Sequence, residues 1–461
     1  MFDMKTFAKV TVWGLIMVGL AGVGCDSNSG NSHEHPHDKA RPGTYPSDYP
    51  DRIVVTWEQD PATSFSVTWR TDSTVSRTRA LIAPASPAPK FHRNADTLAA
   101  STTTVQNPEE NAPAANFHSI TFDDLEPDSL YAYKVGYEGH WSEWFHMRTA
   151  TEQTNQPFSF LYVGDAQNGI YSHWSRAIRQ AYKEEPNAKF IVHAGDLINH
   201  KNRVTEWSEW SQAGGWIQGS IPNVAVPGNH EYLDYRVDDP QPELSIYWKP
   251  QFTLPTNGPK GLEETAYYID YQNIRLIALN SNVQIEKQTQ WLKKVLAKSD
   301  ERWVIVTHHH PIYSSGEGRD NPDIRKQWQP LYEKHHVNLV LQGHDHTYAR
   351  GMTRNTSRGS NTVDPSSGTV YVNSVSGAKM YSLKDNFWKG MGGVLQRSAE
   401  NTQLYQVIHV RRDTLKYRAY TVTGQLYDAF DLVQQPDHRK TRMIDRTPDV
   451  QTRRHDNTIR Y

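Results

Sequence analysis

The sequence of 461 residues contains a single cysteine and almost no excess of charge of either sign. One cysteine excludes an intrachain disulfide framework. Lysine and arginine total 49 against 51 aspartates and glutamates. This balance excludes a general electrostatic attraction for nucleic acid or for an anionic membrane surface, so any attraction for an anion must be local. The 14 tryptophans and 24 tyrosines predict a globular, sheet-rich protein.

The N-terminus has a short apolar run, residues 10–24, preceded by Lys5 and Lys9. This run is shorter than the roughly 20 residues that a membrane-spanning helix needs, so residues 1–25 are predicted to be a signal peptide. Cys25 stands where the apolar run meets a polar stretch, an arrangement that resembles a bacterial lipoprotein signal. We expect an exported protein, either a lipoprotein of the bacterial cell envelope anchored at Cys25 or a periplasmic or secreted protein with an incidental cysteine.

Three regions follow the signal. Residues 26–45 are rich in Ser, Asn, His, Pro and Gly and are predicted to be a flexible linker. Residues 46–150 contain alternating strands separated by turn signals and predict an all-β sandwich similar to a fibronectin type III domain. Residues 157–434 alternate short apolar strands with helical stretches near 172–184, 202–212, 287–298 and 323–335, which predicts a layered α/β domain. Residues 435–461 are predicted to be a polar tail.

Five of the apolar strands in the α/β region end in a polar motif. Because ligands of open α/β sheets bind beyond the carboxyl ends of strands, we expect the five motifs to meet at one rim. Their carboxylates, imidazoles and carboxamide suit transition metals, and one carboxylate can bridge two ions about 3.5–4 Å apart. The motifs are Gly164–Asp165, Gly195–Asp196, Gly228–Asn229–His230–Glu231, Val306 with His309, and Gly343–His344 with His346.

In this order the motifs resemble the five-block signature of the calcineurin-like metallophosphoesterase superfamily. The preceding β domain, residues 51–57 and residues 371–377 resemble the purple acid phosphatases and their bacterial relatives. The resemblance covers residues 45–435. It implies a four-layer metallophosphoesterase β-sandwich flanked by helices, preceded by a small all-β fibronectin type III-like sandwich.

The resemblance also implies a role for each motif residue. Asp196 would bridge two metal ions, and His230 would lie beside the phosphate, where it would stabilise charge or protonate the leaving alkoxide. Asp165 and His346 would bind the first ion. Asn229, His309 and His344 would bind the second ion.

Two positions depart from the family pattern, and both concern the first metal. Asn199 stands where purple acid phosphatases have the tyrosine that binds ferric iron, and Gln167 stands where many other members have a histidine. Each amide could bind the metal or hydrogen-bond one of its ligands. The identity of the two ions, among iron, zinc and manganese, is therefore left open.

The implied function is an acid-phosphatase-like phosphomonoesterase in which a metal-activated hydroxide attacks the phosphorus of a small phosphorylated substrate. One alternative is a phosphodiesterase or nucleotidase, since the same centre serves both ester types. Another is an inactive, surface-anchored binding protein. We find no nucleic-acid-binding signal and expect membrane contact only through a lipid on Cys25.

Several other polar or aromatic residues admit a structural interpretation. His308 and His310 are predicted to pack around the metal ligands, and Asp345 is predicted to have no role. Arg350 could contact phosphate or form an exposed salt bridge. Four tryptophans could line a pocket or fill the core, namely Trp174, Trp207, Trp210 and Trp216.

Overall fold

The computed structural model describes residues 41–108, 110–232, 243–353, 368–384, 387–436 and 440–454. The predicted signal peptide and most of the predicted linker lie outside these residues. From Arg41 onward the chain forms one compact unit. Within the described part of the chain, no helix has the length and apolar character needed to span a bilayer.

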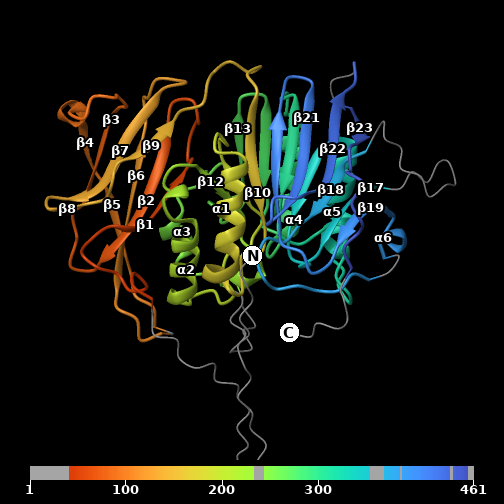
Figure 1. The fold of residues 1–461 in the computed structure, drawn as a ribbon, viewed down its shortest axis with the longest axis horizontal. Coiled ribbons are helices and arrows are strands. Elements are labelled where there is room, and N and C mark those ends of the chain that lie inside the picture. The colour runs from red at the N-terminus through yellow and green to blue at the C-terminus, as the bar shows by residue number, and fades with distance from the viewer. Residues whose placement is uncertain are drawn as a thin grey trace, which may run out of the picture. The chain divides into compact units, whose positions relative to one another are not determined.

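Residues 51–148 form two packed antiparallel sheets, as the sequence predicts (Figure 1). The first has the order β1-β2-β6-β5 and the second β4-β3-β7-β8, with β9 also paired to β7. The strands are β1 (Asp51–Thr56), β2 (Phe65–Asp72), β3 (Arg79–Pro84), β4 (Asp96–Ala99), β5 (Ser101–Val105), β6 (Ala115–Phe122), β7 (Leu130–Tyr137), β8 (His140–Trp141) and β9 (Phe145–Arg148). A 3₁₀ turn, η1 (Phe91–Asn94), precedes β4.

Strand β2 is buried on both faces, although its sequence alternates between apolar and polar residues. Its apolar side chains, such as Trp69, fill the interior of the sandwich. Its polar side packs against the α/β region, where Thr68 Oγ1 donates a 2.6 Å hydrogen bond to the carbonyl of Gln251. The neighbouring backbone of Val55 donates to the carbonyl of Gln218 at 2.9 Å. The sandwich is therefore joined to the α/β region by buried hydrogen bonds.

The α/β region contains two seven-stranded sheets. The first has the order β12-β11-β10-β20-β21-β22-β23, and the second β13-β14-β15-β16-β18-β17-β19. In the first sheet β10, β11 and β12 are parallel, while β20 pairs antiparallel with β10. The strands of the first sheet are β10 (Phe158–Val163), β11 (Ile191–His193), β12 (Asn223–Ala225), β20 (Leu404–Val410), β21 (Thr414–Thr421), β22 (Leu426–Gln434) and β23 (Thr441–Asp445). Those of the second are β13 (Tyr267–Tyr271), β14 (Ile274–Ala278), β15 (Trp303–Thr307), β16 (Leu339–Gln342), β17 (Tyr348–Thr353), β18 (Val370–Asn373) and β19 (Gly393–Ala399).

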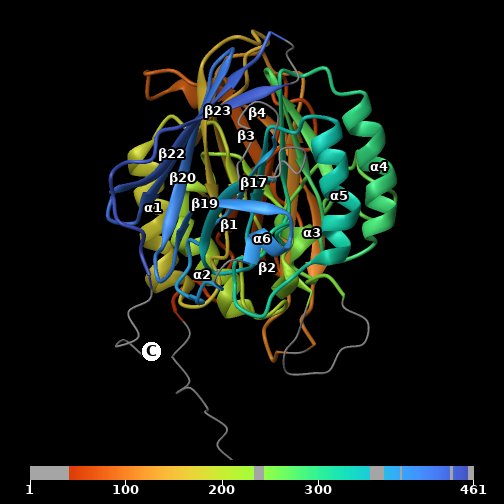
Figure 2. The ribbon, with the colours of Figure 1, turned by 90° about the vertical axis from the view of Figure 1, so that its right-hand side faces the viewer.

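Helices cover the outer faces of the two sheets. Figure 2 shows α1 beside the first sheet and α4 with α5 on the opposite side, which gives the predicted four layers. The predicted helices near 172–184, 202–212, 287–298 and 323–335 are confirmed, with small shifts at their ends. The helical segments are η2 (Ile170–Trp174), α1 (Ser175–Glu184), α2 (Val204–Gly214), η3 (Gly215–Ile217), η4 (Asn229–Glu231), α3 (Trp248–Gln251), α4 (Ile285–Ala297), α5 (Pro322–Lys334) and α6 (Phe387–Gly390).

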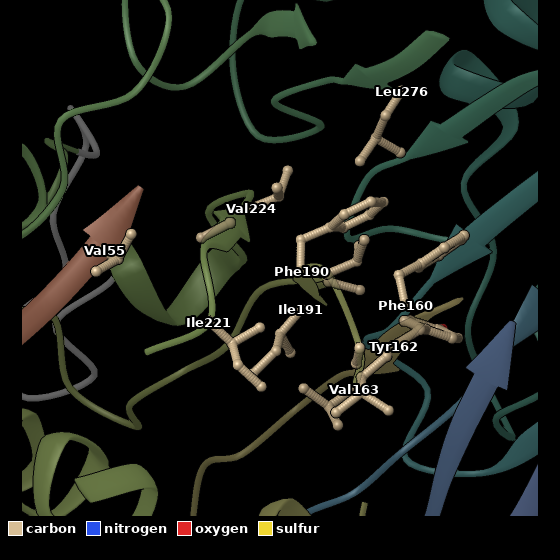
Figure 3. Packing of buried hydrophobic residues seen from close by; sticks show 14 of the residues in the cluster. Val55, Phe160, Tyr162, Val163, Phe190, Ile191, Ile221, Val224 and Leu276 are labelled. Carbon is tan, nitrogen blue, oxygen red and sulfur yellow. The ribbon is translucent and has the colours of Figure 1, made fainter. Parts of the chain in front are cut away.

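Buried aromatic and branched side chains fill the interior (Figure 3). Phe160 of β10 stacks on Phe190, which directly precedes β11, with ring centroids 4.6 Å apart. Burial of each such side chain stabilises the fold by about 1.5–3 kcal/mol. The predicted strands are apolar on both faces because sheet and helix cover them, and this packing fixes the strand ends that carry the polar motifs.

Two predicted unstructured segments are partly ordered. Strand β23 lies inside the predicted tail 435–461 and pairs with β22, because Thr441 and Met443 are buried on one face. The end of the predicted linker 26–45 is also packed. There Arg70 donates hydrogen bonds to the carbonyls of Gly43 and Thr44, both at 3.1 Å. Local composition hides the linker contact because Arg70 is distant in sequence, and it hides β23 because the other residues of this short strand are polar or partly exposed.

Candidate metal centre

The five polar motifs lie where the sequence predicts them, directly after β10, β11, β12, β15 and β16. Four of their residues have left-handed backbone, with φ of 50° at Asp165, 52° at Asp196, 79° at His344 and 50° at His346. Such conformations cost about 1–3 kcal/mol each in residues other than glycine and persist only where surrounding structure enforces them. They turn the side chains off the strand ends toward one another.

Glycines in the motifs allow this close approach. A Cβ on Gly228 would lie 2.1 Å from Asp196 Oδ1, and a Cβ on Gly343 would lie 2.5 Å from Asp165 Oδ2. Both distances are shorter than van der Waals contact. Any larger residue at these positions would therefore displace a predicted metal ligand.

The structure brings the predicted carboxylate and imidazole ligands into two groups that share Asp196. Asp165, Asp196 and His346 have one ligand atom each within 4.8 Å of the others. Asp196, His309 and His344 form the second such group. A shared carboxylate between two sets of ligands is the arrangement that a two-metal site requires.

Asn229 belongs to the second group through its side-chain oxygen. Oδ1 lies 2.9 Å from Nδ1 of His344 and 3.2 Å from Nε2 of His309. Those two ring nitrogens are 3.2 Å apart. All six predicted ligands are thus gathered at one rim of the sheets.

Two of the histidines are oriented by backbone carbonyls. His309 Nδ1 donates to the carbonyl of Ala194 at 2.8 Å, and His346 Nδ1 donates to that of Lys379 at 2.9 Å. Because a carbonyl only accepts, the Nε2 atom carries the lone pair in the neutral form of each ring. This arrangement directs a metal-binding nitrogen into the centre.

The electrostatics of the centre fit a cation. Burial raises the pKa of the Asp165 carboxyl to about 8. Burial lowers the pKa of His309, but Asp196 and Asp165 outweigh it and raise that pKa to about 9. Burial and the charges of neighbouring histidines hold the pKa of His344 well below its usual range. Buried carboxylates here need positive charge, and a divalent ion would supply it in place of a proton on His309.

His230 is held beside the bridging residue. Its Nδ1 donates a 2.6 Å hydrogen bond to the carbonyl of Asn199, and its backbone N–H donates to Asp196 Oδ1 at 2.9 Å. Nε2 lies 3.9 Å from Asp196 Oδ2. The Nε2 nitrogen of His230 therefore faces the centre.

The sequence did not reveal what Glu231 does. Its buried carboxylate accepts backbone N–H groups of Asp196 at 3.0 Å, Leu197 at 2.7 Å and Gly228 at 2.6 Å. It thereby joins the loops after β11 and β12. The available signal was its position two residues after the predicted ligand Asn229. From there a carboxylate can accept hydrogen bonds from backbone N–H groups of nearby turns.

Asp345 also has a role, contrary to prediction. Its buried carboxylate accepts the backbone N–H of Ser315 and that of Gly316, the latter at 3.2 Å. It fixes the loop after β15 against the loop that carries His344 and His346. The prediction was wrong because the partner amides are about 30 residues away.

The other histidines of the fourth motif surround the ligands as predicted. His308 Nδ1 donates to the carbonyl of His310 at 2.8 Å, and its ring packs on Trp328. The His310 ring lies 4.3 Å from that of His344. His310 also lines a cavity of about 420 Å³ next to Asn229.

Arg350 is in neither predicted setting. It is fully buried and forms a bidentate ion pair with Asp428 of β22, with N–O distances of 2.7 and 3.0 Å. This pair lies on strands and joins the two sheets. Among the tryptophans, the core interpretation holds for Trp174, Trp207 and Trp210, whereas Trp216 is 52% exposed.

The comparisons with known families agree with this architecture. The family described as calcineurin-like phosphoesterase matches residues 158–348, and that described as purple acid phosphatase, N-terminal domain, matches residues 50–149. The two matches meet at the junction between the β sandwich and the α/β region.

Curated relatives include purple acid phosphatase 1 from Ipomoea batatas, 25% identical over 52% of this chain and 53% of the relative. The Fe(3+)-Zn(2+) purple acid phosphatase 12 from Arabidopsis thaliana is 26% identical over the same shares. The chain thus spans about half the length of the curated relatives that it matches.

Two solved structures share the fold. A purple acid phosphatase from yellow lupin (Lupinus luteus) seeds superimposes with a TM-score of 0.68 at 17% identity, covering 85% of this chain and 75% of that one. A structure of PhoD gives a TM-score of 0.61 at 14% identity, covering 88% and 95%. The chain therefore combines a calcineurin-like phosphoesterase domain with a purple acid phosphatase N-terminal domain.

Proposed function

We propose that this protein is a dinuclear metal-dependent phosphoesterase that acts on small phosphomonoesters in the manner of an acid phosphatase. The observation that carries the proposal is the pair of ligand groups that share the Asp196 carboxylate. No other described group of three or more His, Cys, Asp or Glu residues has this spacing.

Six side chains would hold the two ions. Asp165 and His346 serve the first, and Asn229, His309 and His344 serve the second, with Asp196 between them. Two divalent ions, when bound there, lower the pKa of a water and clamp the attacking and leaving oxygens of a phosphoryl displacement. The nitrogen and oxygen donors suit iron, zinc or manganese.

His230 would act on the phosphate through one nitrogen. Because Nδ1 is bonded to the Asn199 carbonyl, any proton exchanged with substrate passes through Nε2. That atom either hydrogen-bonds a phosphate oxygen or delivers a proton to the leaving alkoxide. Asn199 contributes by its backbone, which fixes the ring in one orientation.

The cavity beside the second ligand group provides room for a leaving group. It measures about 420 Å³, and its lining includes the neutral polar side chains of Tyr232, Ser281 and Asn282 as well as the carboxylates of Asp320 and Asp323. Such a lining suits an uncharged alcohol that carries hydroxyl groups. The cavity accommodates one organic group, which is all that a monoester substrate carries.

The test is hydrolysis by purified protein loaded with Mn²⁺, Zn²⁺ or Fe²⁺. We expect turnover of 4-nitrophenyl phosphate to exceed that of bis(4-nitrophenyl) phosphate. The reverse preference would assign the chain to the phosphodiesterases, and hydrolysis of neither ester by the metal-loaded protein would refute the enzyme proposal in favour of an inactive binding protein.

A pair of variants tests the role of His230. His230→Ala should retain both metals and lose about 10²–10⁴-fold in kcat, the usual contribution of a general acid or base. The matched control is His118→Ala, which removes a buried, hydrogen-bonded histidine of the β sandwich. An undiminished rate in the first variant would remove His230 from the mechanism.

We further propose that residues 1–25 direct export and that Cys25 carries a lipid. The polar break at this cysteine supports the proposal. Mass spectrometry of the mature N-terminus tests it, and a Cys25 that is unmodified, or still preceded by residues 1–24, would contradict it. We also propose a fibronectin type III-like sandwich for residues 46–150, because the sheets β1-β2-β6-β5 and β4-β3-β7-β9 pack face to face in the architecture that fibronectin type III domains share with immunoglobulin domains.

A further inference from the structure

Gln167 occupies the side of the centre where the first metal would bind. It is fully buried after β10, and its Nε2 lies 2.7 Å from Asp196 Oδ2 and 3.1 Å from His346 Nε2. Its Oε1 is buried and has no hydrogen-bond partner among the described residues. The side chain therefore has one satisfied end and one unsatisfied end.

Both atoms that face Nε2 are electron-pair donors. Asp196 Oδ2 is a carboxylate oxygen, and His346 Nε2 carries the ring's lone pair because its Nδ1 donates to the Lys379 carbonyl. The amide NH₂ thus fills the position of a cation and satisfies two prospective metal ligands with its two N–H groups. A bound cation would compete for these same two atoms.

Rotation of the terminal amide by 180° exchanges its oxygen and nitrogen with little movement of the side chain. The oxygen would then face Asp196 Oδ2 and His346 Nε2. Three lone pairs in such proximity repel one another unless a cation lies between them. The same rotation moves Oε1 out of its unpartnered position and places the NH₂ group there.

We propose that Gln167 binds the first metal through its carboxamide oxygen. The first set of ligands then consists of Asp165, Asp196, Gln167 and His346, with three oxygens, one nitrogen and no anion beyond the two carboxylates. Such a set favours a divalent ion over a trivalent one. Asn199, the other residue that the sequence left open, directs its side-chain amide to the His200 ring at 3.1 Å instead.

Two substitutions at Gln167 distinguish a ligand from a hydrogen-bond donor. Metal content is measured after equilibrium dialysis against Mn²⁺, and Mn²⁺ affinity is measured by electron paramagnetic resonance. Gln167→Glu keeps a ligand oxygen and should retain two ions. Gln167→Leu removes it and should weaken the first site at least tenfold.

If Gln167 only donated N–H groups to Asp196, the two variants would have the opposite order of Mn²⁺ affinity, because a glutamate would repel that carboxylate. Weaker Mn²⁺ binding in Gln167→Glu than in Gln167→Leu, or wild-type affinity in both, would overturn the proposal. Gln406→Leu is the matched control. It removes another fully buried glutamine with an unpartnered Oε1, whose Nε2 contacts Ser374 Oγ at 2.6 Å outside the metal groups.

A different observation concerns a cleft of about 1010 Å³ that we call the basic cleft. It lies between the start of α1, the loop after β18, the β21–β22 turn and the segment near Arg453. Four side chains that can carry positive charge line it, namely His173, Arg176, Lys379 and Arg453. No carboxylate lines it among the described residues, and Arg176, Lys379 and Arg453 form no ion pair within them.

The basic cleft is adjacent to the metal centre. Lys379 lines the cleft, and its own carbonyl accepts the hydrogen bond of His346 Nδ1. The pKa of His346 is held well below its usual range, chiefly by burial and next by the positive charge of Lys379. An anion in the cleft would therefore lie on the side of the first metal, away from the cavity that contains Asp320 and Asp323.

We propose that the basic cleft binds a second phosphate group of a substrate whose first phosphate is hydrolysed at the metals. This inference rests on the proposed phosphoesterase activity. Uncompensated arginine and lysine side chains recognise phosphate by charge and by N–H donation, and threonine hydroxyls of the lining add further donors.

The test compares 4-nitrophenyl phosphate with bisphosphates of ethanediol, butanediol and hexanediol. We expect one bisphosphate to exceed 4-nitrophenyl phosphate in kcat/KM when corrected for leaving-group reactivity. The Arg176→Gln/Lys379→Met double variant should lower the bisphosphate to monophosphate ratio of kcat/KM at least tenfold.

The control is Arg412→Gln, an exposed arginine of the β20–β21 turn, which should leave the ratio unchanged. A wild-type ratio in the double variant would overturn the cleft proposal while leaving the phosphoesterase proposal intact. Absence of all hydrolysis by wild-type protein would instead refute the phosphoesterase proposal.

Discussion

The two halves of the metal centre differ in their donors. The second group presents two imidazoles, a carboxamide oxygen and the shared carboxylate. The first presents two carboxylates, one imidazole and the buried amide of Gln167. A nitrogen-rich set suits zinc or ferrous iron, whereas an oxygen-rich set suits manganese. The comparison indicates that the two ions need not be alike.

The largest expected effect comes from the residue common to both halves. Asp196→Ala removes the bridge and should abolish binding of both ions, with a loss of about 10³–10⁴-fold in kcat/KM, equivalent to several kcal/mol of electrostatic stabilisation. Elemental analysis and steady-state kinetics measure the two losses. Two retained metals would show that the carboxylate does not bridge them.

Single-half variants should separate the sites. Asp165→Ala should lose the first ion and His309→Ala the second, each with about 10²–10³-fold lower kcat. Metal content per chain is the measurement, and one ion should remain in each variant. If both ions leave together in either variant, the halves are one cooperative unit and the comparison fails.

Metal removal should act on stability as well as on activity. A ligand at a hundredfold excess over its Kd stabilises the folded state by about 2.7 kcal/mol per site. Chelation should therefore lower the melting temperature, and Mn²⁺ or Zn²⁺ should restore it in two steps. Calorimetry at fixed protein concentration measures this, and a melting temperature indifferent to metal would contradict binding in both halves.

The smallest expected effect concerns Glu231, whose carboxylate accepts a hydrogen bond from the backbone N–H of the bridging residue Asp196. Glu231→Gln weakens the acceptor of three backbone amides and should reduce metal affinity about 10–100-fold, as for other groups that orient metal ligands. Dialysis against graded metal concentrations measures the change. Because Glu231 accepts hydrogen bonds from the loops after β11 and β12, the position of Asp196 should change more than that of His346.

The ligand set was predictable from the sequence because it depends on local order. Each predicted ligand follows a short apolar strand, and parallel or adjacent strands bring their ends to one rim. The buried pair of Arg350 and Asp428 was not predictable, since its partners are 78 residues apart and meet only when two sheets pack. Strand β23 was missed for a different reason, since its partner β22 is near in sequence but only Thr441 and Met443 of its own residues are buried.

The roles of Gln167 and Asn199 illustrate the limit more closely. Both are amides near the first metal, and the sequence treats them alike. Side-chain direction separates them, because Gln167 turns into the centre while Asn199 turns to His200. The direction of each side chain depends on the backbone conformation at the end of its strand. That conformation cannot be read from the residue type alone.

The left-handed backbone at Asp165, Asp196, His344 and His346 has a consequence for how metals enter. These strained backbone conformations are already fixed in the folded chain. An arriving ion therefore meets a preformed site and reorients only the ends of the ligand side chains. Uptake should then be limited by shedding of the ion's hydration water rather than by loop motion. The backbone of the metal centre is, in this sense, preorganised before any ion binds.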